Sequence, residues 1–99
     1  MAGPVTGAPS RGLSIMIKVL FFARLREELG SAQLELEIEG VATTVAEIID
    51  RLTVEGGERW SRALGAANLV IAVNQRVCSA DEVLRDGDEL AIFPPVTGG

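Results

Sequence analysis

The chain has 99 residues, 47% of them hydrophobic and 23% charged, so we expect one compact domain. Its 9 basic and 14 acidic side chains give a formal net charge of -5, which argues against a protein that binds the phosphate backbone of nucleic acids. With no histidine and one cysteine, Cys78, the sequence excludes an imidazole general base, a histidine-ligated metal site and an internal disulfide, so an autonomous enzyme is not expected.

The first residues carry no recognisable targeting signal. Residues 1–14 are rich in glycine, proline and serine and lack the apolar run of a secretory signal. The longest apolar stretch, 15–23, is interrupted by Lys18 and is too short to span a bilayer. We therefore interpret residues 1–15 as a disordered extension, 16–93 as the folded domain and 94–99 as a flexible tail. A single free cysteine suits a reducing, cytoplasmic setting, and we expect no membrane partner.

Two strands joined by a short helical turn are predicted first. Residues 17–23 are rich in β-branched and aromatic side chains, which favours a strand. A helical turn over 23–29 follows and is stopped by Gly30. In 33–39 three apolar residues alternate with three glutamates, which predicts a half-buried strand with an acidic outer face, antiparallel to the first strand.

The clearest predicted helix begins at Thr44, because Glu47 three residues later completes a capping box. Apolar residues at helical spacing then form one stripe that faces the sheet. The Gly56-Gly57 pair breaks this helix, and residues 58–64 form a second short helix that covers an edge or end of the sheet.

Strand patterns in the last third of the chain lie at 69–73, 76–78 and 89–93. The first of them is almost entirely apolar, as expected of a central strand that is buried on both faces. Asn74-Gln75 predicts a tight turn, residues 81–84 look like a single turn, and 86–88 signal a turn before the last strand.

This element order predicts the fold class. With the first and last strands as neighbours, the chain forms a mixed sheet packed on one main helix. Such an α+β arrangement is a ubiquitin-like β-grasp.

The tail after the last strand carries the most informative motif. Pro94 and Pro95 cannot continue a sheet ladder and favour a stiff exit, while Gly98 and Gly99 form a thin tip without side chains. We expect this tip to enter a narrow channel in another protein, which acts on the terminal carboxylate. The alternative is an inert segment, since chain ends are often glycine-rich.

A carboxylate becomes an acyl donor only after activation. ATP provides this by forming an acyl adenylate, but the sequence lacks a Gly-x-x-x-x-Gly-Lys-Ser/Thr phosphate-binding loop. Activation therefore falls to a separate enzyme that uses ATP in trans, and this chain is its substrate.

Several segments resemble the small, sulfur-carrier subunits of molybdopterin synthase, which belong to a ubiquitin-like family. The match spans residues 16–99, its ending is the most specific part, and residues 1–15 depart from the pattern. The segments that carry the resemblance are 16–23, 26–27, 58–60, 72–75, 86–89 and 93–99.

The resemblance implies a specific use of the tail. In these proteins a ubiquitin-activating-like enzyme adenylates the terminal glycine, here Gly99, and a sulfur donor system converts the adenylate to a thiocarboxylate. The charged subunit docks on the large synthase subunit and passes sulfur to cyclic pyranopterin monophosphate, so that two deliveries build the molybdopterin dithiolene. The chain alone is expected to have no activity, to hold no cofactor or metal and to bind no nucleic acid. The residues inserted into the partner would be Pro94, Pro95, Val96, Thr97 and Gly98.

Strand alternation suggests the docking surface. Lys18 and Glu89 should mark the solvent-facing sides of the first and last strands, which places Phe22 and Phe93 on the same outer face beside the tail. Exposed aromatic side chains are typical of an interface core, and we assign both rings, with Val77, to the partner interface. The alternative is that a turn or bulge rotates the rings into the core.

The remaining polar and reactive residues have ordinary explanations. Cys78 is expected to be a small core residue rather than a thiol relay. The glutamates of 35–39 could attract a basic partner or a cation, but a solvated strand face explains them equally well. Arginines in 24–28 are expected to pair with neighbouring glutamates, and Trp60 to cover the core or a sheet edge.

Alternatives to the molybdopterin carrier remain open. A related carrier could serve thiazole synthesis for thiamine or the thiolation of transfer RNA, and tail composition alone does not separate these clients. The lead-in at 93–97 favours the molybdopterin pathway. A protein modifier would instead join Gly99 to a target lysine, and a binding module would leave the tail inert.

Overall fold

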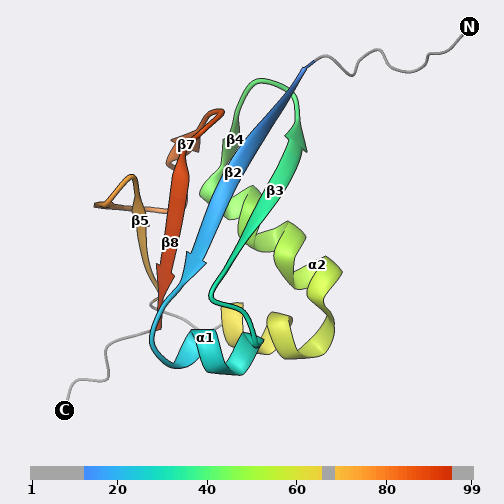
Figure 1. The fold of residues 1–99 in the computed structure, drawn as a ribbon, viewed down its shortest axis with the longest axis vertical. Coiled ribbons are helices and arrows are strands. Elements are labelled where there is room, and N and C mark those ends of the chain that lie inside the picture. The colour runs from blue at the N-terminus through green and yellow to red at the C-terminus, as the bar shows by residue number, and fades with distance from the viewer. Residues whose placement is uncertain (1–12, 66–68, 95–99) are drawn as a thin grey trace, which may run out of the picture.

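A computed structural model describes residues 13–65 and 69–94 of the chain. Both helices lie in the first two thirds of the chain and four strands follow them, and Figure 1 shows the main helix behind a twisted sheet. The elements are β2 (Ser14–Phe21), α1 (Arg24–Leu29), β3 (Gln33–Glu39), β4 (Thr43–Thr44), α2 (Val45–Leu64), β5 (Val70–Val73), β6 (Arg76–Cys78), β7 (Val83–Leu84) and β8 (Glu89–Phe93).

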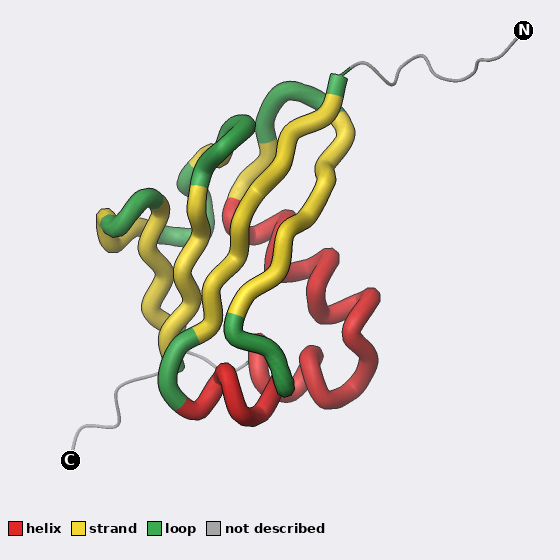
Figure 2. Tube along the Cα trace, viewed as in Figure 1, coloured by secondary structure: helices red, strands yellow, loops and turns green. Residues whose placement is uncertain are grey.

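The main sheet has five strands in the order β3-β2-β8-β5-β6. Strands β2 and β8 are parallel, and the other neighbouring pairs are antiparallel. Helix α2 crosses one face, and α1 lies at the end of the sheet where β2 and β8 finish (Figures 1 and 2). The predicted mixed sheet with adjacent first and last strands, packed on one main helix, is confirmed.

The core lies between this sheet and α2. Alternate residues of β2 are buried, and they meet inward side chains of β8 and the apolar stripe of α2. Trp60 closes one end of this core, because its ring packs edge-on against Phe21 with centroids 5.4 Å apart. The expectation that the tryptophan covers the core is thus confirmed. The fully buried side chains include Ile17, Val19, Phe21, Val45, Ile48, Leu90 and Ile92.

Both glycines at the predicted helix break have a structural reason. Gly57 has φ 81° and ψ -164°, so the chain bends there between two helical segments of α2. A Cβ at Gly56 would lie 2.3 Å from Cγ of Trp60, so a side chain at this position would displace the tryptophan. The bend and the close approach together bring Trp60 onto Phe21.

The predicted capping box at the start of α2 is confirmed. The backbone N–H of Glu47 donates to Oγ1 of Thr44 (3.2 Å), and Oε1 of Glu47 accepts from the backbone N–H of Thr44 (3.0 Å). The same Oε1 accepts from the hydroxyl of Thr43 (2.9 Å). These bonds satisfy donors that a helix start otherwise leaves unpaired.

Stability is expected to depend on the ionised form of Glu47. The bonds from the Thr44 backbone and then the Thr43 hydroxyl hold the pKa of Glu47 below its ordinary value of 4.5. Because the folded pKa is the lower one, the contribution is complete above the unfolded pKa and is lost as the pH falls through the folded pKa. Urea unfolding from neutral to acidic pH should show a smaller acid loss in Glu47→Gln. The control Glu27→Gln should keep the wild-type dependence, and equal dependence in both variants would contradict this account.

Two predicted boundaries are wrong at β2. The strand begins at Ser14 rather than at residue 16 or 17, because Ser14 and Ile15 pair with the end of β3. Ile15 is buried and therefore belongs to the domain, not to an extension. The strand ends at Phe21, and Ala23 turns the chain into α1 with φ 54°.

A small second sheet was missed. Val83–Leu84 forms β7, not a single turn, and pairs antiparallel with β4, Thr43–Thr44. Two-residue strands show no periodicity along the sequence. Their pairing comes from tertiary contact, since Leu84 is completely buried.

The predicted turns around β8 are confirmed and are tied together. Asn74 and Gln75 both have positive φ, 50° and 71°, as in the type I′ turns that close two-residue hairpins. The side-chain Nδ2 of Asn74 donates to Oδ1 of Asp88 (3.0 Å), and the side-chain Oδ1 of Asn74 accepts from the backbone N–H of Glu89 (3.1 Å). The start of β8 is therefore held against the hairpin between β5 and β6.

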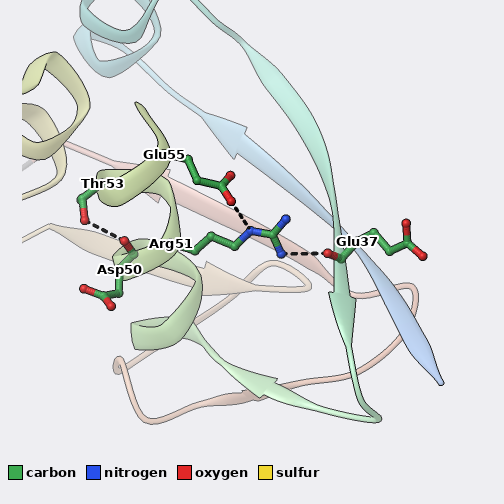
Figure 3. A network of polar contacts seen from close by, with 5 residues as sticks. All are labelled: Glu37, Asp50, Arg51, Thr53 and Glu55. Atoms are coloured by element: carbon green, nitrogen blue, oxygen red, sulfur yellow. Dashed lines mark hydrogen bonds and ion pairs between the residues drawn. The ribbon is translucent and has the colours of Figure 1, made fainter. Parts of the chain in front are cut away.

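Arg51 connects α2 to the outer strand β3. Its Nη1 donates to the backbone oxygen of Glu37 (2.8 Å), and its Nε donates to Oε2 of Glu55 (3.0 Å) (Figure 3). The carboxylates of β3 are exposed on the other side. No group of side chains within 13–65 and 69–94 is arranged to hold a metal ion, and the three glutamates of β3 are exposed, as expected of a solvated strand face.

Candidate functional site

The candidate site is the place where the predicted tail leaves the sheet, at Phe93 and Pro94, which we call the root of the tail. Strands β2 and β8 finish at the same end of the sheet, next to α1 (Figure 1). Pro94 directly follows β8 and so begins at this end. Pro94 is the last described residue. The other predicted tail residues, Pro95, Val96, Thr97, Gly98 and Gly99, lie outside the described part of the chain.

Phe22 and Phe93 form a stacked pair at this root. Their ring centroids are 4.6 Å apart and their planes differ by 8°. The parallel register that aligns Leu20 with Ala91 places them opposite each other, and the N–H of Phe22 donates to the oxygen of Ile92 (3.1 Å). Both rings are half-buried. They are therefore less exposed than the predicted interface residues would be, but they are not rotated into the core as the alternative proposed.

The pair lies on the face of the sheet that is turned away from α2. Its chain neighbours Phe21 and Ile92 point inward and are buried, and successive side chains of a strand point to opposite faces. The rings thus stack on the outer face, where strand alternation had placed them.

Strand register extends this outer face to Val77. Aligned residues of neighbouring strands share a face of the sheet. Val77 is 77% exposed on the edge strand β6, and Phe22, Phe93 and Val77 all belong to this face. One row consists of Leu20, Ala91, Ala72 and Val77, and the next of Phe22, Phe93 and Val70.

We call these seven residues the outer apolar face. Val70 and Ala72 were not recognised from the sequence, where β5 is simply apolar on both sides. Only the strand order shows which of its residues align with Phe93 and Ala91. Ala72 and Ala91 are themselves buried, so the exposed part of this face comes from its other members, above all Val77.

The outer face of the sheet becomes charged toward β3. Lys18 is aligned with Glu89 on one side and with Glu35 on the other, and β3 continues outward with exposed acidic side chains. A partner that covers the root of the tail therefore meets an apolar surface bounded along one side by carboxylates. Such a polar border around an apolar centre is typical of protein interfaces.

Cys78 follows Val77 in β6 and belongs to the inner face of the sheet, where it is aligned with the buried Ile71. It is half-buried and packs against the core cluster. Burial, and then the negative charge of Glu82, raises the pKa of Cys78, which disfavours the thiolate. This agrees with a packing role rather than a thiol relay.

One of the predicted local ion pairs is present on α1. Nε of Arg24 lies 3.9 Å from Oε2 of Glu28, and both side chains are about half exposed. Exposed pairs of this kind contribute little to stability. Among the helices of the described ranges, none has the length and apolarity that crossing a membrane requires.

Comparisons with known proteins agree over nearly the whole chain. The model of the ThiS family matches residues 19–99. The molybdopterin synthase sulfur carrier subunit of Escherichia coli strain K12 is 45% identical over 84 residues, which cover 85% of this chain and 100% of that protein. The protein of the same name from Haemophilus influenzae is 40% identical over the same shares.

A solved structure also shares the fold. The small archaeal modifier protein 1 of H. volcanii has a TM-score of 0.69 and 30% identity, with 83% of this chain and 99% of that chain covered. Its similarity, with the observed strand order, confirms the ubiquitin-like β-grasp.

Proposed function

The chain belongs to the ThiS family, and from this membership we propose that it is the sulfur-carrier subunit of molybdopterin synthase. The observation that carries the proposal is the similarity to relatives of that name over their entire length. The family match reaches residue 99, so it includes the Gly-Gly motif that the chemistry requires.

The proposed chemistry takes place at the Gly99 carboxylate. One carboxylate oxygen attacks the α-phosphorus of ATP on a separate activating enzyme, forming the acyl adenylate and releasing pyrophosphate. Sulfur at the sulfide level, supplied by a sulfur donor, then displaces AMP and leaves a thiocarboxylate. On the large synthase subunit this sulfur forms a bond to cyclic pyranopterin monophosphate, and water hydrolyses the acyl–sulfur bond and restores the Gly99 carboxylate. Two loaded chains supply the two sulfurs of the dithiolene.

The length of the tail supports a division of labour between the subunits. Five residues follow Pro94, the last of them Gly99, so an extended tail reaches at most about 18 Å beyond the sheet. In that extended state the carboxylate lies away from the side chains around Pro94, which supports a division of labour in which the partners supply the catalytic groups.

The outer apolar face is the proposed docking surface for the large subunit. It lies at the point where the tail leaves the sheet, so a protein that encloses the tail covers this face as well. Phe22, Phe93 and Val77 are the proposed contacts. A stacked aromatic pair with partly exposed rings offers large apolar area at little cost in side-chain entropy.

A protein modifier is the second candidate, because the chain is 30% identical to a small archaeal modifier protein. In that case the activated Gly99 carboxyl forms an amide with a lysine of a target protein. A sulfur carrier for thiamine or transfer RNA would use the same activated tail and differ only in the acceptor of the sulfur.

Intact mass spectrometry tests the proposal. The full chain is incubated with its activating enzyme, ATP and a sulfur donor, and is expected to exchange one carboxyl oxygen for sulfur. Adding the large subunit and the pyranopterin substrate should return the original mass as sulfur is transferred. Controls without ATP or without sulfur donor should show no exchange.

The alternatives give different results in the same experiment. Covalent adducts with other proteins would favour the modifier. An exchange that the large subunit does not reverse would favour another client. An unchanged mass, with partners shown to be active on a known carrier, would refute the carrier chemistry.

A further inference from the structure

An open hollow of about 550 Å³ lies on the α1 side of the tail root. It is formed between α1 and the last turns of α2, which pack against each other at this end of the molecule. We call it the arginine hollow, since its polar lining consists of Arg24, Glu28, Glu58, Arg59 and Arg62, with Pro94 in its wall.

The hollow has a local excess of positive charge although the chain as a whole is acidic. Three arginines face two glutamates in its lining, whereas the net charge of the chain is -5. Arg24 pairs with Glu28 and Arg62 with Glu58, the latter at 2.9 Å. Both glutamates are thus engaged with an arginine of their own helix.

Arg59 is the third arginine of the hollow. No salt bridge or side-chain hydrogen bond joins it to another residue within the described ranges. Its Nη1 lies 3.8 Å from the position of a Cβ at Gly30, the residue that ends α1. The guanidinium is therefore placed against α1 with hydrogen-bond donors available to an outside acceptor.

The hollow lies beside Pro94, the last described residue before the tail. When the tail is extended, a nucleotide joined to Gly99 would lie up to about 18 Å beyond Pro94. In that extended state the cation faces a protein surface that surrounds the start of the tail.

The hollow continues the proposed docking surface around the tail. Pro94 belongs to its wall, and the preceding residue, Phe93, belongs to the aromatic pair on the outer apolar face. A protein that encloses the tail at Pro94 therefore meets both the aromatic pair and the guanidinium of Arg59.

We propose that the arginine hollow binds an acidic segment at the mouth of the large subunit's tail channel, with Arg59 as the principal contact. This inference rests on the proposed function. A carboxylate there would accept hydrogen bonds from a guanidinium fork, and its charge would set the orientation in which the tail enters. The contact adds electrostatic selectivity to a surface that is otherwise apolar.

The test measures binding of the full chain to its large subunit by calorimetry at low and high ionic strength. Arg59→Glu is expected to weaken binding by about 10- to 100-fold at low salt, and the difference should shrink as salt screens the charges. Arg59→Gln should show a smaller loss of the same kind. The matched control is Arg85→Glu, because Arg85 lies before the opposite end of β8 and carries the same charge change.

Equal weakening by Arg59→Glu and Arg85→Glu would overturn the inference, since it would show only a net-charge effect. The inference would also be overturned if both Arg59 variants bound the large subunit like the wild type, or if they lost binding only to the activating enzyme. Melting curves of each variant check that the fold is kept. If unchanged binding were seen while the wild-type chain still acquired and transferred sulfur, the hollow would fail and the proposed function would stand. If the wild-type chain neither acquired nor transferred sulfur, the proposed function and the inference that rests on it would both fail.

Discussion

Adding one alanine after Gly99 is expected to abolish sulfur transfer without unfolding the domain. The extra residue moves the reactive carboxyl group by about 3.5 Å and places a methyl group where the proposed channel receives bare backbone. Since a misplacement of about 1 Å can cost about 100-fold in rate, we expect at least that loss in thiocarboxylate formation and transfer. The residue lies beyond the described domain, so the melting temperature should not change.

The matched control carries the same alanine before Met1. It has the same added mass and composition but leaves the tail intact, and it should keep wild-type transfer measured as molybdopterin formed per loaded chain. Binding of the extended chain to the large subunit, measured in parallel, separates loss of docking from loss of chemistry. Full transfer by the chain extended after Gly99 would refute a mechanism at the terminal carboxylate.

Phe93→Ala is expected to have the second largest effect, a loss of docking on the large subunit. Aromatic side chains at the centre of an interface commonly contribute about 2 kcal/mol or more, so we expect binding at least about 30-fold weaker. From the sequence alone, the ring would be exposed and its removal would barely change the melting temperature. The stacked pair changes this expectation, because losing the partner of Phe22 should cost about 1 kcal/mol of folding stability.

Calorimetric binding and urea unfolding of the same preparation distinguish these effects. Val54→Ala is the control, since Val54 is 74% exposed on α2 and lies outside the outer apolar face. It should leave both docking and stability near wild type. A stability loss of several kcal/mol with normal docking would identify Phe93 as a core residue and would remove it from the proposed interface.

Elements with a strong local signal were predictable. The capping box at Thr44 involves residues three positions apart, and the alternation in β3 follows from the pleat of one strand. Both are set by near neighbours in the sequence. The glycine bend was likewise visible, although the contact between Gly56 and Trp60 that helps explain it was not.

Elements that depend on distant partners were not predictable. Strands β4 and β7 are too short to show periodicity and exist because residues about 40 positions apart pair with each other. The start of β2 at Ser14 similarly depends on the length of β3 opposite it. For β4 and β7 the missing information was the identity of the pairing strand, and for β2 it was the register with β3, since the pairing itself was predicted.

The candidate site also has features that were predictable from the sequence and features that depend on distant partners. The Gly-Gly tail and the placement of Phe22 and Phe93 on one face follow from residue types and strand alternation, which act along the chain. Their stacking requires the parallel register of β2 and β8. The arginine hollow joins α1, α2 and Pro94, which are far apart in sequence and carry no shared motif.

The amino-acid order by itself thus determined the class of fold and a tail suited to carboxyl chemistry, because propensity, capping and alternation are properties of neighbouring residues. Tertiary structure alone decided what surrounds the root of that tail. Packing of the sheet against its helices brings the aromatic pair and the guanidinium of Arg59, which has no salt bridge among the described residues, close to Pro94, and such proximity is a property of the folded chain.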